Sequence, residues 1–267
     1  MQIKRRAALS LGLAGFLPAA RAASPAVVQA LAPDGHLRAA INFGNPVLAQ
    51  KDPATGAPRG VSVDLAYELG RELGAPVTLI PFNEAGRVFA ALKSNAWDVA
   101  FLAIDPVRAA DIDFTPAYVQ IEGAYLVHSD SPLHTVADVD RNGLRIAVAQ
   151  GSAYDLYLTR ALKHATIVRL PNSDDATATF LKDHLDVLAG VKQPLSAYVK
   201  THPGTRLIPG RFMSIDQAMG TPKGRPAGAA FLRSFIEKAK ASGFVAQALA
   251  RSGQGDATVA PAANDAG

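Results

Sequence analysis

One arginine, Arg108, follows the apolar run DVAFLAI at residues 98–104, in a short turn that also holds Asp105 and Pro106. An arginine in a loop is most often a solvated surface charge. A planar guanidinium nevertheless offers two parallel N–H donors that match a carboxylate, which a lysine ammonium does not. Arg108 is therefore a candidate for binding an anionic group, provided that the fold places it in a cleft.

A second candidate for anion binding lies in the stretch QGSAYD at 150–155, where Gly151 and Ser152 open a predicted helix. Helix N-termini present free N–H donors and the positive end of the helix dipole, which suits an anion. The alternative is an ordinary helix cap, because serine is a favoured N-cap residue. The two turns together predict a site for a small anion.

Other kinds of chemistry find little support in the residue types. The chain has no cysteine, which excludes disulfides, a thiol nucleophile, a thiolate metal site and a lipid-modified N-terminal cysteine. His128, His134 and His164 lack metal-ligand spacing, and no serine sits in a nucleophile-elbow pattern. No glycine-rich phosphate loop is present. We expect no catalytic residue, no metal and no cofactor.

Strands and helices alternate along the chain, which predicts an α/β fold with largely parallel strands. Two such units in a chain of 267 residues predict two lobes. In open α/β sheets ligands bind beyond the carboxyl ends of the strands, where Arg108 and Ser152 stand in their respective units. The expected strands are 37–43, 77–82, 98–102, 123–128 and 144–149, and the expected helices include 64–73, 86–96, 152–164 and 226–242.

The first residues have the layout of an export signal. A basic start, MQIKRR, precedes an apolar stretch and the small residues ARA at 20–22, which predicts cleavage near Ala22 and release into the periplasm. The apolar stretch is too short for the alternative, a membrane anchor. This segment carries four of the 27 Lys and Arg residues and no acid, so 23 cationic and 23 acidic residues remain. The basic net charge therefore gives no ground for a nucleic-acid partner.

Four stretches in order resemble family 3 of the periplasmic solute-binding proteins of ABC importers, the amino-acid-binding group. They are GVSVDLAYELGRELG, ALKSNAWDVAFLAIDPVRAADIDFTPAY, LRIAVAQGSAYDLYL and FIEKAKASGFVAQAL. The resemblance spans about residues 35–252. It implies a Venus-flytrap, the two-lobed periplasmic-binding-protein fold, whose two hinge strands connect the lobes near 119–123 and 213–218.

The resemblance also implies a division of the chain. Lobe 1 is expected at 35–120 plus 217–252 and lobe 2 at 121–213, with a signal peptide at 1–22 and a disordered tail at 253–267. Such a protein is expected to act as a monomer, to capture a small carboxylate-bearing ligand by lobe closure and to deliver it to an inner-membrane ABC permease.

By the same resemblance, Arg108 occupies the place of the arginine that binds the α-carboxylate of the ligand. The family's acid for the α-ammonium group is missing, since Val191 or Lys192 stands at that position, and the usual aromatic pair is replaced by Asn45 and Ala85. These departures favour an organic acid or a modified amino acid. The expected ligand-binding residues are Arg108, Ser152, Asp105, Asn42, Phe43, Asn45, Ala103, Ala153, Glu122, Lys192 and Gln217.

Two alternatives to a binding protein stay open. Some relatives of this fold are periplasmic dehydratases of the cyclohexadienyl type, which need a proton donor in the cleft, and Glu122 is the acid that would serve. The other alternative is an accessory protein that has kept the fold but lost its ligand. We predict a binding protein that is not an enzyme.

Overall fold

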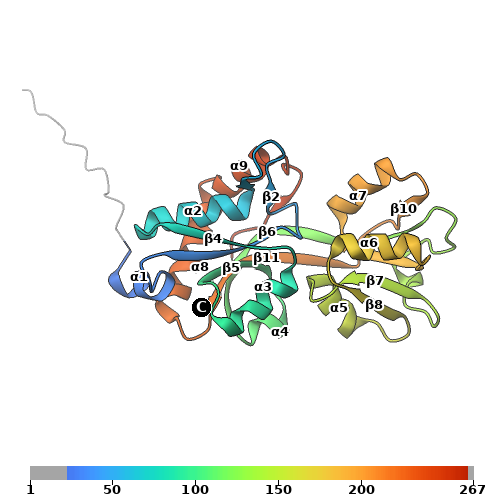
Figure 1. The fold of residues 1–267 in the computed structure, drawn as a ribbon, viewed down its shortest axis with the longest axis horizontal. Helices are drawn as coiled ribbons and strands as arrows, with labels where there is room; N and C mark the ends of the chain where they lie inside the picture. The colour runs from blue at the N-terminus through green and yellow to red at the C-terminus, as the bar shows by residue number, and fades with distance from the viewer. Residues whose placement is uncertain (1–22, 264–267) are drawn as a thin grey trace, which may run out of the picture.

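A computed structural model describes residues 23–263 of the chain, and they form two lobes (Figure 1). The first lobe contains α1 (Pro25–Leu31), β1 (Leu37–Asn42), β2 (Gln50–Lys51), β3 (Pro58–Arg59), α2 (Val61–Leu73), β4 (Val77–Phe82), α3 (Ala85–Ala91), the 3-10 turn η1 (Leu92–Ser94), β5 (Val99–Ala103), α4 (Pro106–Ala109), α8 (Pro226–Ala241) and α9 (Phe244–Arg251). The second lobe contains the 3-10 turn η2 (Val136–Asp138), β7 (Arg145–Ala149), α5 (Ala153–Ala161), β8 (Thr166–Leu170), α6 (Ser173–Lys182), β9 (Val187–Val191), α7 (Lys192–Thr201) and β10 (Thr205–Leu207).

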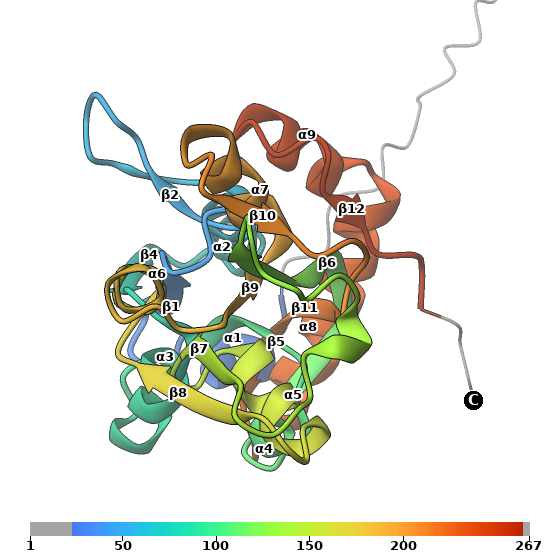
Figure 2. The same cartoon turned by 90° about the vertical axis from the view of Figure 1, so that its right-hand side faces the viewer.

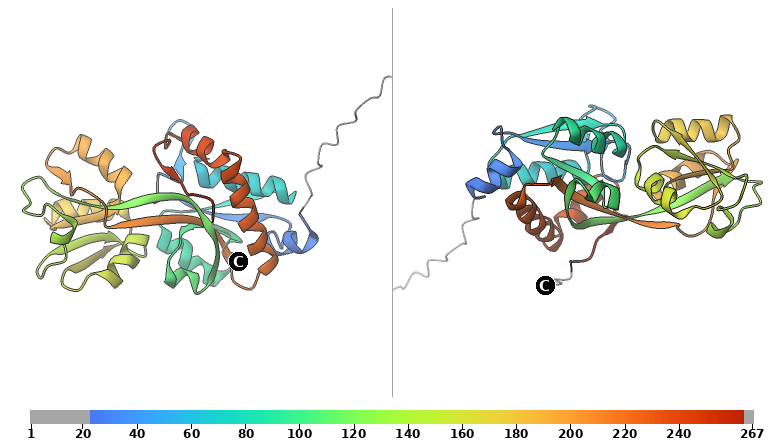
Figure 3. Two further views of the ribbon diagram at one scale, coloured as in Figure 1. Left: turned by 180° about the vertical axis from the view of Figure 1, so that it is seen from behind. Right: turned by 90° about the horizontal axis from the view of Figure 1, so that it is seen from below.

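Two long strands belong to both lobes. They are β6 (Ile112–His128) and β11 (Met213–Pro222), which pair antiparallel and cross from one lobe to the other (Figures 1 and 3). Within residues 23–263 they join one sheet of ten strands, whose central path runs β4-β1-β5-β11-β6-β9-β7-β8. The prediction of an α/β fold with two lobes and two hinge strands is confirmed.

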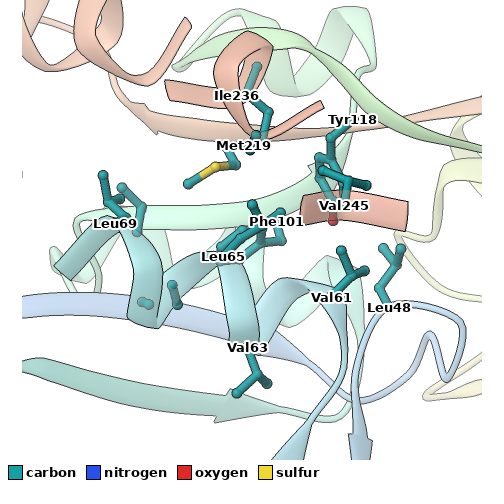
Figure 4. Close-up of a cluster of buried hydrophobic side chains, with 14 of the residues drawn as sticks. Leu48, Val61, Val63, Leu65, Leu69, Phe101, Tyr118, Met219, Ile236 and Val245 are labelled. Atoms are coloured by element: carbon teal, nitrogen blue, oxygen red, sulfur yellow. The ribbon is translucent and has the colours of Figure 1, made fainter. Parts of the chain in front are cut away.

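The core of the first lobe explains why the strand ahead of Arg108 is rigid. All five residues of β5 are buried, as expected for a strand covered on both faces. On one face Phe101 packs with the apolar side of α2, where Val61, Leu65 and Leu69 recur every fourth residue (Figure 4). On the other face Leu102 and its neighbours pack with α3. The strand end is thereby fixed relative to the whole lobe.

The second lobe has a separate core on each face of its strands. Tyr154 and Leu158 of α5 pack with β7 on one face, and Phe180 of α6 and Leu195 of α7 pack on the other. Figure 2 views this lobe from its outer end, with α5 and α6 on opposite sides of β7. The start of α5 is therefore held at the edge that faces the first lobe.

The structure differs from the sequence predictions at several element ends. The helix expected from residue 64 begins at Val61, and Asp64, in its first turn, pairs with Arg251 of α9 at 2.8 Å. The tail expected to be disordered contains the strand β12 (Thr258–Val259), which pairs with β6 because that strand offers a free edge there.

Other sequence predictions concern the ends of the chain. The predicted signal at 1–22 lies outside the described residues, as do residues 264–267. Among the residues that are described, no helix has the length and apolar character needed to cross a membrane.

Candidate functional site

Arg108 lies inside the protein, where the two lobes meet. Asp105 is the N-cap of α4, and its Oδ1 accepts a hydrogen bond from the Val107 amide at 2.9 Å. This single helical turn places Arg108 so that its side chain is fully buried. Its Nη1 donates to the carbonyl oxygen of Ala103 at 3.0 Å, and its Nη2 donates across the lobes to the carbonyl oxygen of Gly151 at 2.8 Å. Arg108 is therefore not a solvated surface charge.

One edge of the Arg108 guanidinium faces the other lobe. Nη1 is anchored on its own lobe, whereas Nε has no hydrogen-bond partner among the described residues. Nε and Nη2 form an edge with which arginine binds a carboxylate through two parallel bonds. Burial lowers the pKa of Arg108 to about 10, an effect that the nearby Asp105 charge opposes, so the guanidinium stays charged at neutral pH.

The start of α5 satisfies much of its own hydrogen-bonding capacity. The Oγ of Ser152 accepts a hydrogen bond from the Asp155 amide at 3.0 Å, and the Asp155 carboxylate accepts one from the Gly151 amide at 2.8 Å. Arg169 Nε in turn donates to Asp155 at 2.9 Å. An acid in the first helical turn also offsets the positive end of the dipole. This helix start is therefore less open to an outside anion than its sequence suggests.

Two glycines allow the lobes to come into main-chain contact beside Arg108. A Cβ added to Gly86, in α3, would lie 2.7 Å from the carbonyl oxygen of Gln150, and a Cβ added to Gly151 would lie 2.8 Å from the Cα of Gly86. Gly151 also has a φ of +71°, a left-handed conformation that glycine adopts without cost. Glycine is therefore needed at both positions for the lobes to approach this closely.

Two further polar contacts join the lobes around this point. Arg160 Nη2 of α5 donates to Asp105 Oδ2 at 2.7 Å. The Ser173 amide at the start of α6 donates to Glu84 Oε1 at 2.7 Å. Burial raises the pKa of Glu84 above its ordinary value, and the hydrogen bonds from Ser173 oppose that rise. The structure therefore shows a closed arrangement of the two lobes.

The space beside Arg108 is small in this arrangement. It is a cavity of about 30 Å³, room for roughly one water molecule, whereas ligand pockets are typically about 300–1,000 Å³. Most of the residues expected to bind the ligand line it: Arg108, Ser152, Asn42, Asn45, Ala103, Ala153 and Gln217. The fold therefore brings these residues together, around a space that a whole ligand would exceed.

A much larger cavity lies on the other side of Glu84, which lines both. It has a volume of about 800 Å³ and extends between the β1–α2 connection of the first lobe and α6, β9 and α7 of the second. Phe43 lines this cavity, and Asp105 lines neither of the two. The closed cleft thus has a narrow end at Arg108 and a wide part at α6 and α7.

Glu122 and Lys192 lie elsewhere. Lys192 Nζ donates to Glu122 at 2.5 Å, and Arg211 donates to the second oxygen of Glu122 at 3.1 Å. All three line a separate cavity of about 510 Å³ beside the hinge strands. The hydrogen bond from Lys192 keeps the pKa of Glu122 below its ordinary value, against the effect of burial. Glu122 is therefore held in its charged form, which is unsuited to a proton donor.

The small cavity is also lined by residues that were not expected from the sequence, among them Glu84, Tyr154 and Ile215. Glu84 precedes α3 in the turn after β4. Because ligands bind beyond the carboxyl ends of strands, this position could have indicated Glu84 as a candidate site residue. Among residues 23–263 no group of three or more His, Cys, Asp or Glu side chains is arranged to hold a metal ion.

Comparisons with known proteins agree with this architecture. Residues 37–253 match the model of the bacterial extracellular solute-binding proteins, family 3. A glutamine-binding protein of Geobacillus stearothermophilus is 20% identical over 193 residues, which are 71% of this chain and 73% of that protein.

Several solved structures have a similar fold. A solute receptor for L-cysteine of Neisseria gonorrhoeae superposes with a TM-score of 0.74 at 20% identity, covering 85% of this chain and 93% of that one. A mutant of ArgBP from T. maritima has a TM-score of 0.72 at 21% identity, covering 85% and 98%. An ancestral amino acid-binding protein, described as a precursor of cyclohexadienyl dehydratase, has a TM-score of 0.68 at 21% identity, covering 82% and 96%. At these identities the likeness concerns the fold.

Proposed function

Because the chain belongs to family 3 of the bacterial extracellular solute-binding proteins, we propose that it is the solute-binding component of an ABC importer of the amino-acid type. The observation that carries this proposal is the pair of strands β6 and β11, which join two lobes whose facing surfaces enclose a cleft. A two-lobed receptor of this kind binds its ligand by hinge closure. The importer's permease is the partner that receives the ligand.

A carboxylate on the ligand is the finer part of the proposal. Its support is the Nε–Nη2 edge of Arg108, since Nη1 is already fixed by Ala103 and Nε has no partner among the described residues. The Gly151 carbonyl, which accepts the hydrogen bond from Nη2, belongs to the other lobe and moves away when the lobes separate. A ligand carboxylate would then compete with the Gly151 carbonyl for this edge.

A protein that keeps the fold without a ligand is the second candidate, favoured by the 30 Å³ volume of the cavity at Arg108. Mass spectrometry of small molecules released from the purified protein separates the two. A co-purifying organic molecule that rebinds after removal supports the receptor. The absence of any bound molecule from protein purified under several growth conditions supports the second candidate.

Gly86→Ala is expected to weaken ligand binding about 5- to 140-fold, because inserting a methyl group into a tight contact typically costs about 1–3 kcal/mol. The added Cβ meets main-chain atoms of the second lobe, so closure has to stop short. Alanine is at the same time the better helix former, so α3 itself is not weakened. Small-angle scattering and calorimetry with the co-purified molecule measure compaction and affinity.

The control is Gly204→Ala, where an added Cβ has nothing within 4 Å. It should leave both quantities unchanged. If Gly86→Ala binds and compacts like the unaltered protein, the ligand-bound state keeps the lobes further apart at Gly86 than they are here.

Export to the periplasm is proposed from the basic start of the sequence, the apolar stretch and the small residues at 20–22. Expression of the full chain with a C-terminal tag should give periplasmic protein that begins near Ala23. Fractionation and N-terminal sequencing measure this. Cytoplasmic protein that retains Met1 would contradict the proposal.

A further inference from the structure

The wide part of the cleft is acidic. Glu84 and Asp174 are among the described residues that line the 800 Å³ cavity, and no lysine, arginine or histidine is. Lys51 is close to one wall, with Nζ 5.4 Å from the centroid of the Phe43 ring, but it does not line the cavity. The electrostatic field in this space therefore favours a cation over an anion.

Glu84 is the group in this cavity with the strongest need for a partner. Its side chain is almost fully buried, with 4% of the residue exposed. Oε1 accepts the Ser173 amide at 2.7 Å, and among the described residues no lysine, arginine or histidine forms an ion pair with this carboxylate. The carboxylate lies against Gly44, where an added Cβ would come within 2.9 Å of Oε2. A carboxylate buried to this extent without an ion-pair partner is costly, and a cationic donor would offset that cost.

Much of the remaining wall of the cavity is apolar or aromatic, and its neutral polar side chains are Asn83, Asn172, Ser173 and Thr177. Phe43 contributes from the first lobe, and Leu181, Leu195 and Tyr198 contribute from α6 and α7 of the second. Leu181 is one of the few large apolar side chains on the surface, with 37% of the residue exposed, and it faces this space. Such a wall stabilises a hydrocarbon or aromatic group that is removed from water.

We propose that the ligand carries a protonated amine bound by Glu84 and an apolar body that lies along α6 and α7. This inference rests on the proposed function and adds the chemical class of the ligand. It also supplies a counter-ion that the sequence seemed to lack, because the acid stands on the first lobe at Glu84 and not on the second at Val191 or Lys192. A carboxylate directed to Arg108 is compatible with it, since Glu84 and Arg108 both line the small cavity.

The test compares ligands that share a skeleton and differ in charge. Phenethylamine, 3-phenylpropionate and 2-phenylethanol are titrated by calorimetry at one neutral pH. The amine should bind at least about tenfold more tightly than the other two, because hydrogen bonds to a buried charged group are the stronger kind. Glu84→Gln should then weaken amine binding about ten- to a hundredfold and leave 2-phenylethanol within about threefold.

Glu84→Gln keeps an oxygen to accept the Ser173 amide, so the lobe contact survives. Because the variant also removes a buried charge, its unfolding temperature without ligand should be equal or higher. The matched control is Glu68→Gln on the outer surface of α2, where Glu68 pairs with Arg71 of the same helix. It should leave amine binding unchanged.

Equal binding of the amine and the carboxylate, absence of amine binding, or an undiminished affinity in Glu84→Gln would each overturn the inference. The proposed function fails in a different way. If the protein binds a co-purified molecule of another class, independently of Glu84, only the amine inference is wrong. If no small molecule of any class binds or co-purifies, the receptor function is wrong as well.

Discussion

Arg108→Ala is expected to weaken ligand binding by about thirtyfold or more while both lobes remain folded. The variant removes the Nη2 bond to Gly151 across the lobes and the Nε–Nη2 edge proposed for a ligand carboxylate. Truncating one member of a buried charge-assisted pair costs about 2–5 kcal/mol, and each 1.4 kcal/mol is about tenfold in affinity. Calorimetry with the molecule that co-purifies with the unaltered protein measures the loss.

Two further variants make this result specific. Arg233→Ala removes an exposed charge from α8 and should leave affinity unchanged. Arg108→Lys keeps the charge and loses the planar donor edge, so it should not restore binding. If Arg108→Ala lowers the ligand affinity by less than about threefold, with the fold intact by circular dichroism, Arg108 has a structural role and does not contribute to ligand binding.

Asp98→Ala is expected to lower the free energy of unfolding by about 3–5 kcal/mol, the usual cost of breaking a buried ion pair. Asp98 has a fully buried side chain that accepts hydrogen bonds from Arg38 Nη2 at 2.8 Å and Arg225 Nη1 at 3.0 Å. It thereby ties β1 and the start of α8 to β5, the strand that leads into the turn with Arg108. For a protein of this size the loss corresponds to roughly 6–20 °C in the unfolding temperature. Urea and thermal unfolding measure it.

The Asp98 contribution also has a predictable pH dependence. Burial would raise the pKa of Asp98, but the hydrogen bonds from Arg38 and Arg225 outweigh it and hold the pKa below its ordinary value. A carboxyl group with a lowered pKa stabilises the folded state above its unfolded pKa of about 3.9, and the contribution is lost as the pH falls below that value. As the pH is lowered below about 4, the free energy of unfolding should therefore fall less in Asp98→Ala than in the unaltered protein.

Asp111→Asn, at an exposed position ahead of β6, is the control and should change neither the unfolding free energy nor its pH dependence. An Asp98→Ala protein with unaltered urea midpoint at neutral pH would mean that Arg38 and Arg225 reach water when their partner is removed. The ion pairs would then contribute little.

Much of the fold follows from local patterns that do not depend on tertiary contacts. The run DVAFLAI predicts a strand because it is continuously apolar, and β5 occupies Val99–Ala103. Alternation of such runs with helical periodicity predicts α/β lobes, and the two hinge strands β6 and β11 lie where the resemblance implies them. Element ends were less predictable, because α2 begins at Val61 through packing against its neighbours and not at the acid Asp64.

The contents of the cleft depended on which surfaces the lobes turn toward each other. Ser152 and Asp155 lie one helical turn apart in the sequence. Only the structure shows that the Asp155 carboxylate accepts the Gly151 amide, so that this donor is not free for a ligand. Glu122 lies in the hinge strand β6 and Lys192 begins α7, which are suitable positions for ligand contacts, yet the two residues pair with each other. Glu84 belongs to no sequence motif, and its contact with Ser173 of the other lobe could not be read from the sequence.

The sequence by itself determined the elements, the two lobes and the place of Arg108 at the end of a buried strand, because periodicity and turn residues act over a few positions in the chain. Tertiary structure decided that Arg108 donates to Gly151, that Glu84 lies between a narrow and a wide cavity, and that the lobes touch at Gly86. Those contacts join residues many positions apart on separate lobes. Their geometry depends on the packing of whole lobes and on the absence of a side chain at two glycines, which no local pattern encodes.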